Sequence, residues 1–224
     1  MLQQISGFLT SEECDAIRAS MDTTLVSAST FTATNAANYQ EYAETQRSSG
    51  LFIDEPNASY SWGTGGRGSR SQVFFDRTDS LVSSVRSRLT TESGLSVTHQ
   101  TKPLGIKYAV GHQYTQRNDF LTALTWTGTL TAEQEWYKNR ISQGGQRLKT
   151  LIVFLNDGYD GGRIQFSGAG IITPVKGNAI LFDVSKTENG ILVADTNNTY
   201  TDLIVTSGTK YTMHVSIRED VPGV

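Results

Sequence analysis

The sequence is poor in residue types that mark several common classes of protein. Its 224 residues include one cysteine, Cys14, which excludes an internal disulfide bond and a zinc site built from thiolates. No apolar run approaches the roughly 18–20 residues that a membrane-spanning helix needs, and no signal peptide precedes Ile5. We therefore expect no membrane partner, no disulfide partner and no leader segment.

Charge is also scarce, at 18% of all residues, and the net charge is −3. This balance gives no electrostatic reason to expect nucleic acid or an anionic membrane as a partner. Hydrophobic residues make up 37%, which is enough for a core and too much for a disordered chain. With four prolines, no Pro-rich linker and no internal repeat, the whole chain (1–224) is predicted to be a single domain.

The first part of the chain, residues 1–95, is predicted to be a supporting region of helices and short strands. Residues 5–9 form a short apolar strand, and Thr10 or Ser11 can then cap a helix with acidic residues in its first turn. Apolar residues at helical spacing predict a second, amphipathic helix over residues 79–91. The buried faces expected for these two helices consist of Cys14, Ile17 and Met21, and of Leu81, Val82, Val85 and Leu89.

From residue 97 to residue 220 the pattern changes to about eight short strands separated by Gly, Asn and Pro turns. Helices followed by many short strands indicate a mainly β, α+β fold, in which a sandwich or jelly roll carries the N-terminal helices on one face. An insertion is expected at about 120–143, with a helical stretch over 131–141.

Fragments along nearly the whole chain resemble the prolyl 4-hydroxylase-like 2-oxoglutarate/iron(II) dioxygenases. The resemblance implies a double-stranded β-helix (jelly roll, cupin-like), while function has to be argued from the site. The fragments, in order, are FLTSEEC at 8–14, RSSG at 47–50, GGQR at 144–147, GG at 161–162, the segment from Pro174 to Phe182, and VTSGTKY at 205–211.

A seventh segment, Tyr108 to Asp119, resembles the family's iron-binding strand pair. The family holds iron with two histidines and one carboxylate. The resemblance places these ligands at Arg117, Asp119 and Tyr200, so only the carboxylate of Asp119 is retained. Arginine stays protonated and has no lone pair to give to a metal. We therefore assign no catalytic residue and no metal ligand, and we expect an eroded triad.

Two further positions resemble the binding site of the cosubstrate. Lys210 stands where the family's lysine pairs with the distal carboxylate of 2-oxoglutarate, and Tyr108 stands where a tyrosine often contacts it. Lys210 is read either as a strand lysine facing solvent or an acid, or as part of a vestigial anion pocket. Arg117 and Asp119 lie two residues apart, so their side chains can face the same side. Our hypothesis is that the guanidinium enters the metal position and pairs with Asp119.

Three functional hypotheses remain open. The first is a pseudoenzyme: a non-catalytic structural or interaction protein without cofactor, which contacts other protein subunits, in a phage virion for example or in the cytoplasm. The second is an active prolyl 4-hydroxylase-like oxygenase that uses Fe(II) and 2-oxoglutarate. The third is a sensor that binds a dicarboxylate through Lys210 and Arg117. The three histidines, His99, His112 and His214, are expected in surface or core roles.

Overall fold

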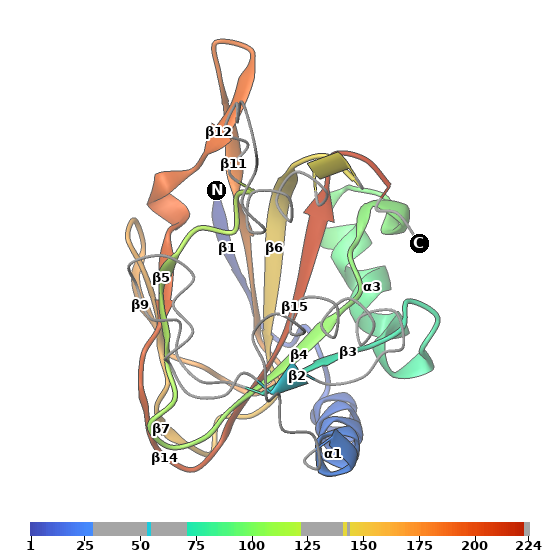
Figure 1. Cartoon of the computed structure of the whole chain (residues 1–224), viewed down its shortest axis with the longest axis vertical. Coiled ribbons are helices and arrows are strands. Elements are labelled where there is room, and N and C mark those ends of the chain that lie inside the picture. Colours follow the sequence, from blue (N-terminus) through green and yellow to red (C-terminus); the bar gives the residue numbers. More distant parts are fainter. Residues whose placement is uncertain (29–52, 55–70, 122–140, 143, 222–224) are drawn as a thin grey trace, which may run out of the picture.

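The computed structural model describes residues 1–28, 53–54, 71–121, 141–142 and 144–221. Within these ranges the fold is mainly antiparallel β with two α-helices, α1 (Ser11–Ala28) and α3 (Ser80–Ser93). Figure 1 shows both helices on one side of the large sheet and the small sheet on the other side. This is the jelly-roll architecture that the sequence predicts, with the helices packed on one face.

The large sheet and the small sheet face each other across the interior of the jelly roll. In spatial order the large sheet consists of β1 (Leu2–Ile5), β10 (Ala179–Asp183), β6 (Arg147–Phe154), β15 (Lys210–Arg218), β4 (Leu104–Tyr108), β3 (Ser71–Phe74) and β2 (Ile53–Asp54). The small sheet consists of β5 (Tyr114–Arg117), β13 (Tyr200–Asp202), β8 (Ile164–Phe166) and β9 (Gly170–Ile172).

Two strand pairs and two short 3-10 helices complete the described elements. β14 (Val205–Ser207) pairs with β7 (Asp160–Gly161), and β11 (Ser185–Glu188) forms a hairpin with β12 (Ile191–Ala194) that projects from one end of the molecule (Figure 1). The 3-10 helices are η1 (Val97–His99) and η2 (Thr196–Asn198).

Both helices begin where side chains satisfy their free N–H groups. The Thr10 hydroxyl accepts a hydrogen bond from the Glu13 N–H, and the Glu13 carboxylate accepts one from the Thr10 N–H, which is a reciprocal capping box. Asp79 caps α3 by accepting from the Leu81 N–H. Gly94 ends α3 at φ 68°, a conformation that costs glycine little.

The main core lies between the helices and the large sheet. Cys14, Ile17 and Met21 of α1 are fully buried there, as the helical spacing predicts. The buried face that the sequence predicts for α3 is confirmed as well, although Leu81, at the margin of this face, is only partly buried. Strand β15 supplies the sheet side with Tyr211, Met213, Val215 and Ile217. A second apolar cluster, between the two sheets, includes Ile152, Phe154, Ile164, Phe166, Ile180, Phe182 and Tyr200.

Some predictions of local structure need correction. The first strand is Leu2–Ile5 and not residues 5–9, because residues 6–9 form the turn that leads into α1. The segment from Tyr108 to Asp119 does not form the expected strand pair, since β4 pairs with β3 and β15 while β5 pairs with β13 of the other sheet. The expected insertion at about 120–143 lies almost wholly outside the described residues. Among the described helices, none is both long and apolar enough to cross a membrane.

Candidate functional site

The candidate site is a cluster of buried polar side chains in the interior between the two sheets, and we call the region that they occupy the chamber. Along β15, residues alternate between the core under the helices and this interior. Lys210, Thr212 and His214 therefore line the chamber from the large sheet, and all three are at most 9% exposed. The small sheet contributes Arg117 from β5 and Asp202 from β13, and Asp202 is completely buried.

Arg117 is held in place by two aromatic rings and one carboxylate. Its guanidinium carbon lies 3.6 Å from the ring centre of Tyr114 and 4.0 Å from that of Tyr200, its cross-strand neighbour. Its Nη2 donates to Oδ2 of Asp202 at 2.6 Å. Cation–π stacking together with an ion pair fixes the charge in one position. The hypothesis paired Arg117 with Asp119, and this partner was wrong, because the ion pair is with Asp202.

Lys210 donates from Nζ to the other oxygen of the same carboxylate, Oδ1 of Asp202, also at 2.6 Å. Its ammonium also lies 4.9 Å from the ring centre of Tyr108, its partner across the β4–β15 pair. Burial alone would raise the pKa of Asp202, but the charges of Lys210 and Arg117 hold it far below its usual value. One carboxylate of the chain thus pairs both with Lys210, at the position of the family's anion-binding lysine, and with Arg117, at the position of a metal-binding histidine.

Asp119 follows β5 and takes part in a separate hydrogen-bonded group. The Tyr200 hydroxyl donates to its Oδ2 at 3.1 Å, and the Thr150 hydroxyl donates to the same oxygen at 2.9 Å. Burial acts to raise the pKa of Asp119, yet the nearby charges of Arg147 and Arg117 lower it. Burial also raises the pKa of Tyr200 well above its usual value, so this phenol is a neutral hydrogen-bond donor.

Only one of the three histidines lies in the chamber. His214 has its Nε2 3.2 Å from the Thr212 hydroxyl, and burial lowers its pKa to about 4, which makes it neutral at pH 7. His99 contacts the Arg218 carbonyl outside the chamber, and His112 lies between β4 and β5 beside the Ala109 N–H. Within the described ranges, no three His, Cys, Asp or Glu side chains gather closely enough to hold a metal ion.

The side chains at the three positions where the resemblance places iron ligands do not fit Fe(II). Asp119 offers a carboxylate whose oxygens already accept from Tyr200 and Thr150. The Tyr200 phenol keeps its proton, and the Arg117 guanidinium repels a cation and has no lone pair. The three positions thus offer one carboxylate, whereas a facial triad has two imidazoles and one carboxylate. No step of an iron-dependent reaction can therefore be built from these residues.

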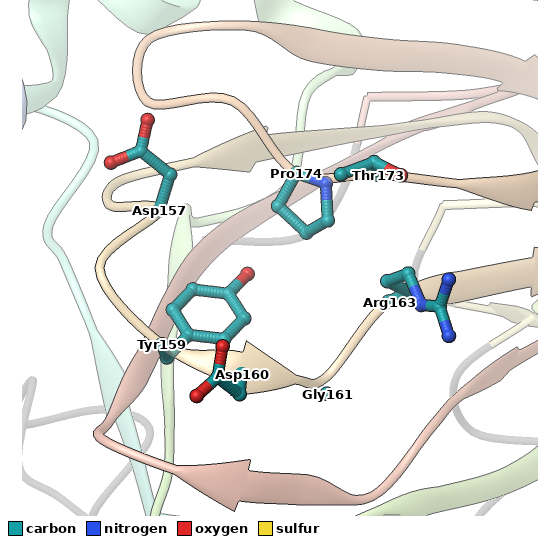
Figure 2. Close-up of a pocket in the computed structure, with 7 residues that line it drawn as sticks. All are labelled: Asp157, Tyr159, Asp160, Gly161, Arg163, Thr173 and Pro174. Atoms are coloured by element: carbon teal, nitrogen blue, oxygen red, sulfur yellow. The ribbon is translucent and has the colours of Figure 1, made fainter.

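A hollow of about 200 Å³ lies beside β7 and β8, and Figure 2 shows the residues that line it. Tyr159 lines it, and the buried hydroxyl of Tyr159 has no hydrogen-bond partner among the described residues. Tyr159 also approaches the chamber at Gly162, which has φ +56°. A Cβ added there would lie 2.8 Å from the Tyr159 ring and 3.2 Å from Cδ of Lys210. The absence of a side chain at Gly162 thus leaves room for both Tyr159 and Lys210 to pack against the backbone there.

Sequence reasoning missed Asp202, which is the centre of the ion cluster. One signal was present: Tyr200 and Asp202 lie two residues apart on one strand, so an inward Tyr200 places Asp202 inward as well. Two buried acids, Asp202 on β13 and Asp119 just after β5, then compete for one arginine. Asp202 forms the ion pair, while Asp119 is satisfied by the hydroxyls of Tyr200 and Thr150.

Several solved structures with a similar fold are prolyl hydroxylases. A viral collagen prolyl hydroxylase from Paramecium bursaria Chlorella virus-1, solved as a complex with 2OG, matches with a TM-score of 0.57 and 18% identity, over 97% of this chain and 94% of that one. A prolyl 4-hydroxylase from Pseudomonas putida matches with a TM-score of 0.51 and 12% identity, over 97% and 91% of the two chains.

A third match is a prolyl hydroxylase from Trichoplax adhaerens, solved with a peptide fragment of the oxygen degradation domain of hypoxia inducible factor. Its TM-score is 0.50 and its identity is 13%, over 97% of this chain and 83% of that one. No family model matches the sequence, and a search of curated proteins gives no match. At these identities the likeness establishes the fold of the prolyl 4-hydroxylase-like oxygenases and leaves the chemistry to the site.

Proposed function

We propose that this chain is a non-catalytic structural or interaction protein built on the fold of the 2-oxoglutarate/iron oxygenases. The observation that carries the proposal is the place of Arg117. A permanently charged guanidinium, stacked between two tyrosine rings and paired with Asp202, occupies the position that the resemblance assigns to a metal-binding histidine. A fixed cation at that position opposes the binding of Fe(II) both by charge and by the lack of a donor atom.

The cosubstrate position supports the same conclusion. In the family resemblance, Lys210 is the cation for the distal carboxylate of 2-oxoglutarate. Here Lys210 is completely buried and already bound to Asp202. The same contact argues against a dicarboxylate sensor, because both cations of the expected pocket share one internal partner.

The test is the affinity of the purified protein for Fe(II), measured under anaerobic conditions with and without 2-oxoglutarate. We expect no stoichiometric iron in either condition. One iron per chain, or iron-dependent turnover of 2-oxoglutarate, would contradict the proposal and establish the active oxygenase instead.

Two double variants locate the cause of the lost metal site. Arg117→His with Tyr200→His places two imidazoles beside Asp119 and is expected to bind Fe(II) where the parent protein does not. Arg117→Gln with Tyr200→Phe removes the same charge and phenol without adding a strong ligand, and it serves as the matched control. Equal iron binding by the two double variants would show that the three positions do not form the ancestral metal site.

The specific role that we propose is that of a subunit in a larger protein assembly, such as a phage virion. The low charge and the many Thr, Ser, Asn and Gly residues of the sequence support it. Mass spectrometry of purified particles from the source tests this role, and consistent absence of the chain from them would contradict it.

A further inference from the structure

The carboxylate of Asp202 is bound as an external anion would be. Its two oxygens accept from two cations that reach it from different sheets, each at 2.6 Å. Asp202 and Lys210 are completely buried, and the Arg117 side chain is 14% exposed. We propose that Asp202 is a built-in ligand: it fills a carboxylate-binding site, formed by Lys210 and Arg117, that would otherwise take a small carboxylate from solution.

The two cations need an anion in this place. A buried ammonium or guanidinium without a counter-charge is strongly destabilising, and a carboxylate with hydrogen bonds to both of its oxygens compensates best. Asp119, the other acid of the chamber, is bound to Tyr200 and Thr150. Within the described part of the chain, no carboxylate other than that of Asp202 is within ion-pair distance of Lys210 or Arg117.

The cations are also held in place independently of Asp202. The rings of Tyr114 and Tyr200 lie on the Arg117 guanidinium, and the Tyr108 ring lies beside the Lys210 ammonium. One guanidinium nitrogen, Nη1 of Arg117, is buried and has no hydrogen-bond partner in the described chain. If the Asp202 carboxylate is removed, a preorganised pair of cations remains that can accept another carboxylate with little rearrangement.

The number of atoms removed at position 202 determines which anion fits the space that is left. Asp202→Ala keeps Cβ and removes only the carboxylate group, which leaves a space that matches formate. Asp202→Gly also removes Cβ and leaves a space that matches acetate. Asp202→Asn removes the charge but fills the space with an amide, so it is the matched control that leaves no room for an added anion.

The experiment measures the melting temperature of each protein in sodium formate and in sodium chloride at equal ionic strength. For Asp202→Ala we expect a saturable rise of roughly 5 °C that is specific to formate, because a ligand that binds only the folded state raises its stability. Asp202→Gly should respond to acetate as well as to formate. The parent protein and Asp202→Asn should respond to neither beyond the effect of chloride.

Asp195→Ala provides a second control, because Asp195 is a buried acid that accepts hydrogen bonds from the Asn197 N–H and from the side-chain amide of Asn198. It should lose stability and gain no response to formate. A folded Asp202→Ala variant that formate stabilises no more than chloride does would overturn the proposal. A parent protein that binds formate in the chamber as tightly as the variant would also overturn it.

If Asp202→Ala does not fold in chloride, its refolding yield is compared between formate and chloride. Recovery in formate alone supports the built-in ligand, whereas equal failure in both salts, together with failure of Asp202→Gly in acetate, contradicts it. No iron is involved in these measurements, so their outcome is independent of the iron-binding test of the proposed function.

Discussion

The two faces of strand β15 are buried to a similar extent and are chemically opposite. The face toward the helices carries large apolar side chains, whereas the face toward the small sheet carries an ammonium, a hydroxyl and an imidazole. The contrast teaches that burial in this molecule is achieved in two ways, by removing apolar surface from water on one face and by pairing charges on the other. The outer set is Tyr211, Met213, Val215 and Ile217, and the inner set is Lys210, Thr212 and His214.

The largest effect is expected from breaking the charge pairing of the inner face. Lys210→Met preserves the length of the side chain and removes the ammonium, which leaves Asp202 with a single cationic partner. We expect a loss of roughly 3–5 kcal/mol in the free energy of unfolding, measured by urea denaturation.

The matched control for this variant is Lys149→Met. Lys149 pairs with Asp183 at a partly exposed position, so its loss should cost about 1 kcal/mol or less. Equal losses in the two variants would mean that burial does not distinguish the two ion pairs.

The inner face should also make stability depend on pH. Burial lowers the pKa of His214 to about 4, whereas the unfolded value is about 6.5. Between these values the unfolded chain binds a proton that the folded chain does not bind, so stability falls as the pH drops from 6.5 to 4, by about 3 kcal/mol in total. The charges that surround the ring are those of Asp202, Arg117, Asp119 and Lys210.

Unfolding free energies measured from pH 7 to pH 4 test this dependence. His214→Gln keeps a polar group near Thr212 and removes the titration, so its curve should be flatter over this range. Ile217→Val, which changes the outer face of the strand and no titrating group, should keep the slope of the parent protein. The same slope in the His214 variant would assign the dependence to other groups.

The smallest effect is expected from a conservative change on the outer face. Ile217→Val removes one methylene group from a fully buried position under the helices and should cost about 1 kcal/mol, independent of pH. Urea denaturation at pH 7 and at pH 5 measures both parts of this prediction. A pH-dependent loss would show that the two faces of the strand are coupled.

The core between the helices and the outer face of β15 was more predictable from the sequence than the inner face. Apolar residues at helical spacing identified Cys14, Ile17 and Met21 as core, because that spacing reports burial directly. The inner face depends on which strands lie opposite each other. The pairing of β5 with β13 brings Arg117 beside Tyr200. The spacing of Tyr200 and Asp202 indicates that the two side chains share a face, but it does not show which cations lie opposite Asp202. The order of motifs indicated the fold, while the ion pairs required the three-dimensional arrangement.

The attachment of Asp202 to the chain has a consequence for how this protein responds to its surroundings. A protein whose buried cations bind a dissolved acid gains stability in proportion to the logarithm of the concentration of that acid. Here the acid is part of the polypeptide, so its amount is one per chain at any dilution. The folded fraction should therefore stay constant when the concentrations of small carboxylates in the medium rise or fall.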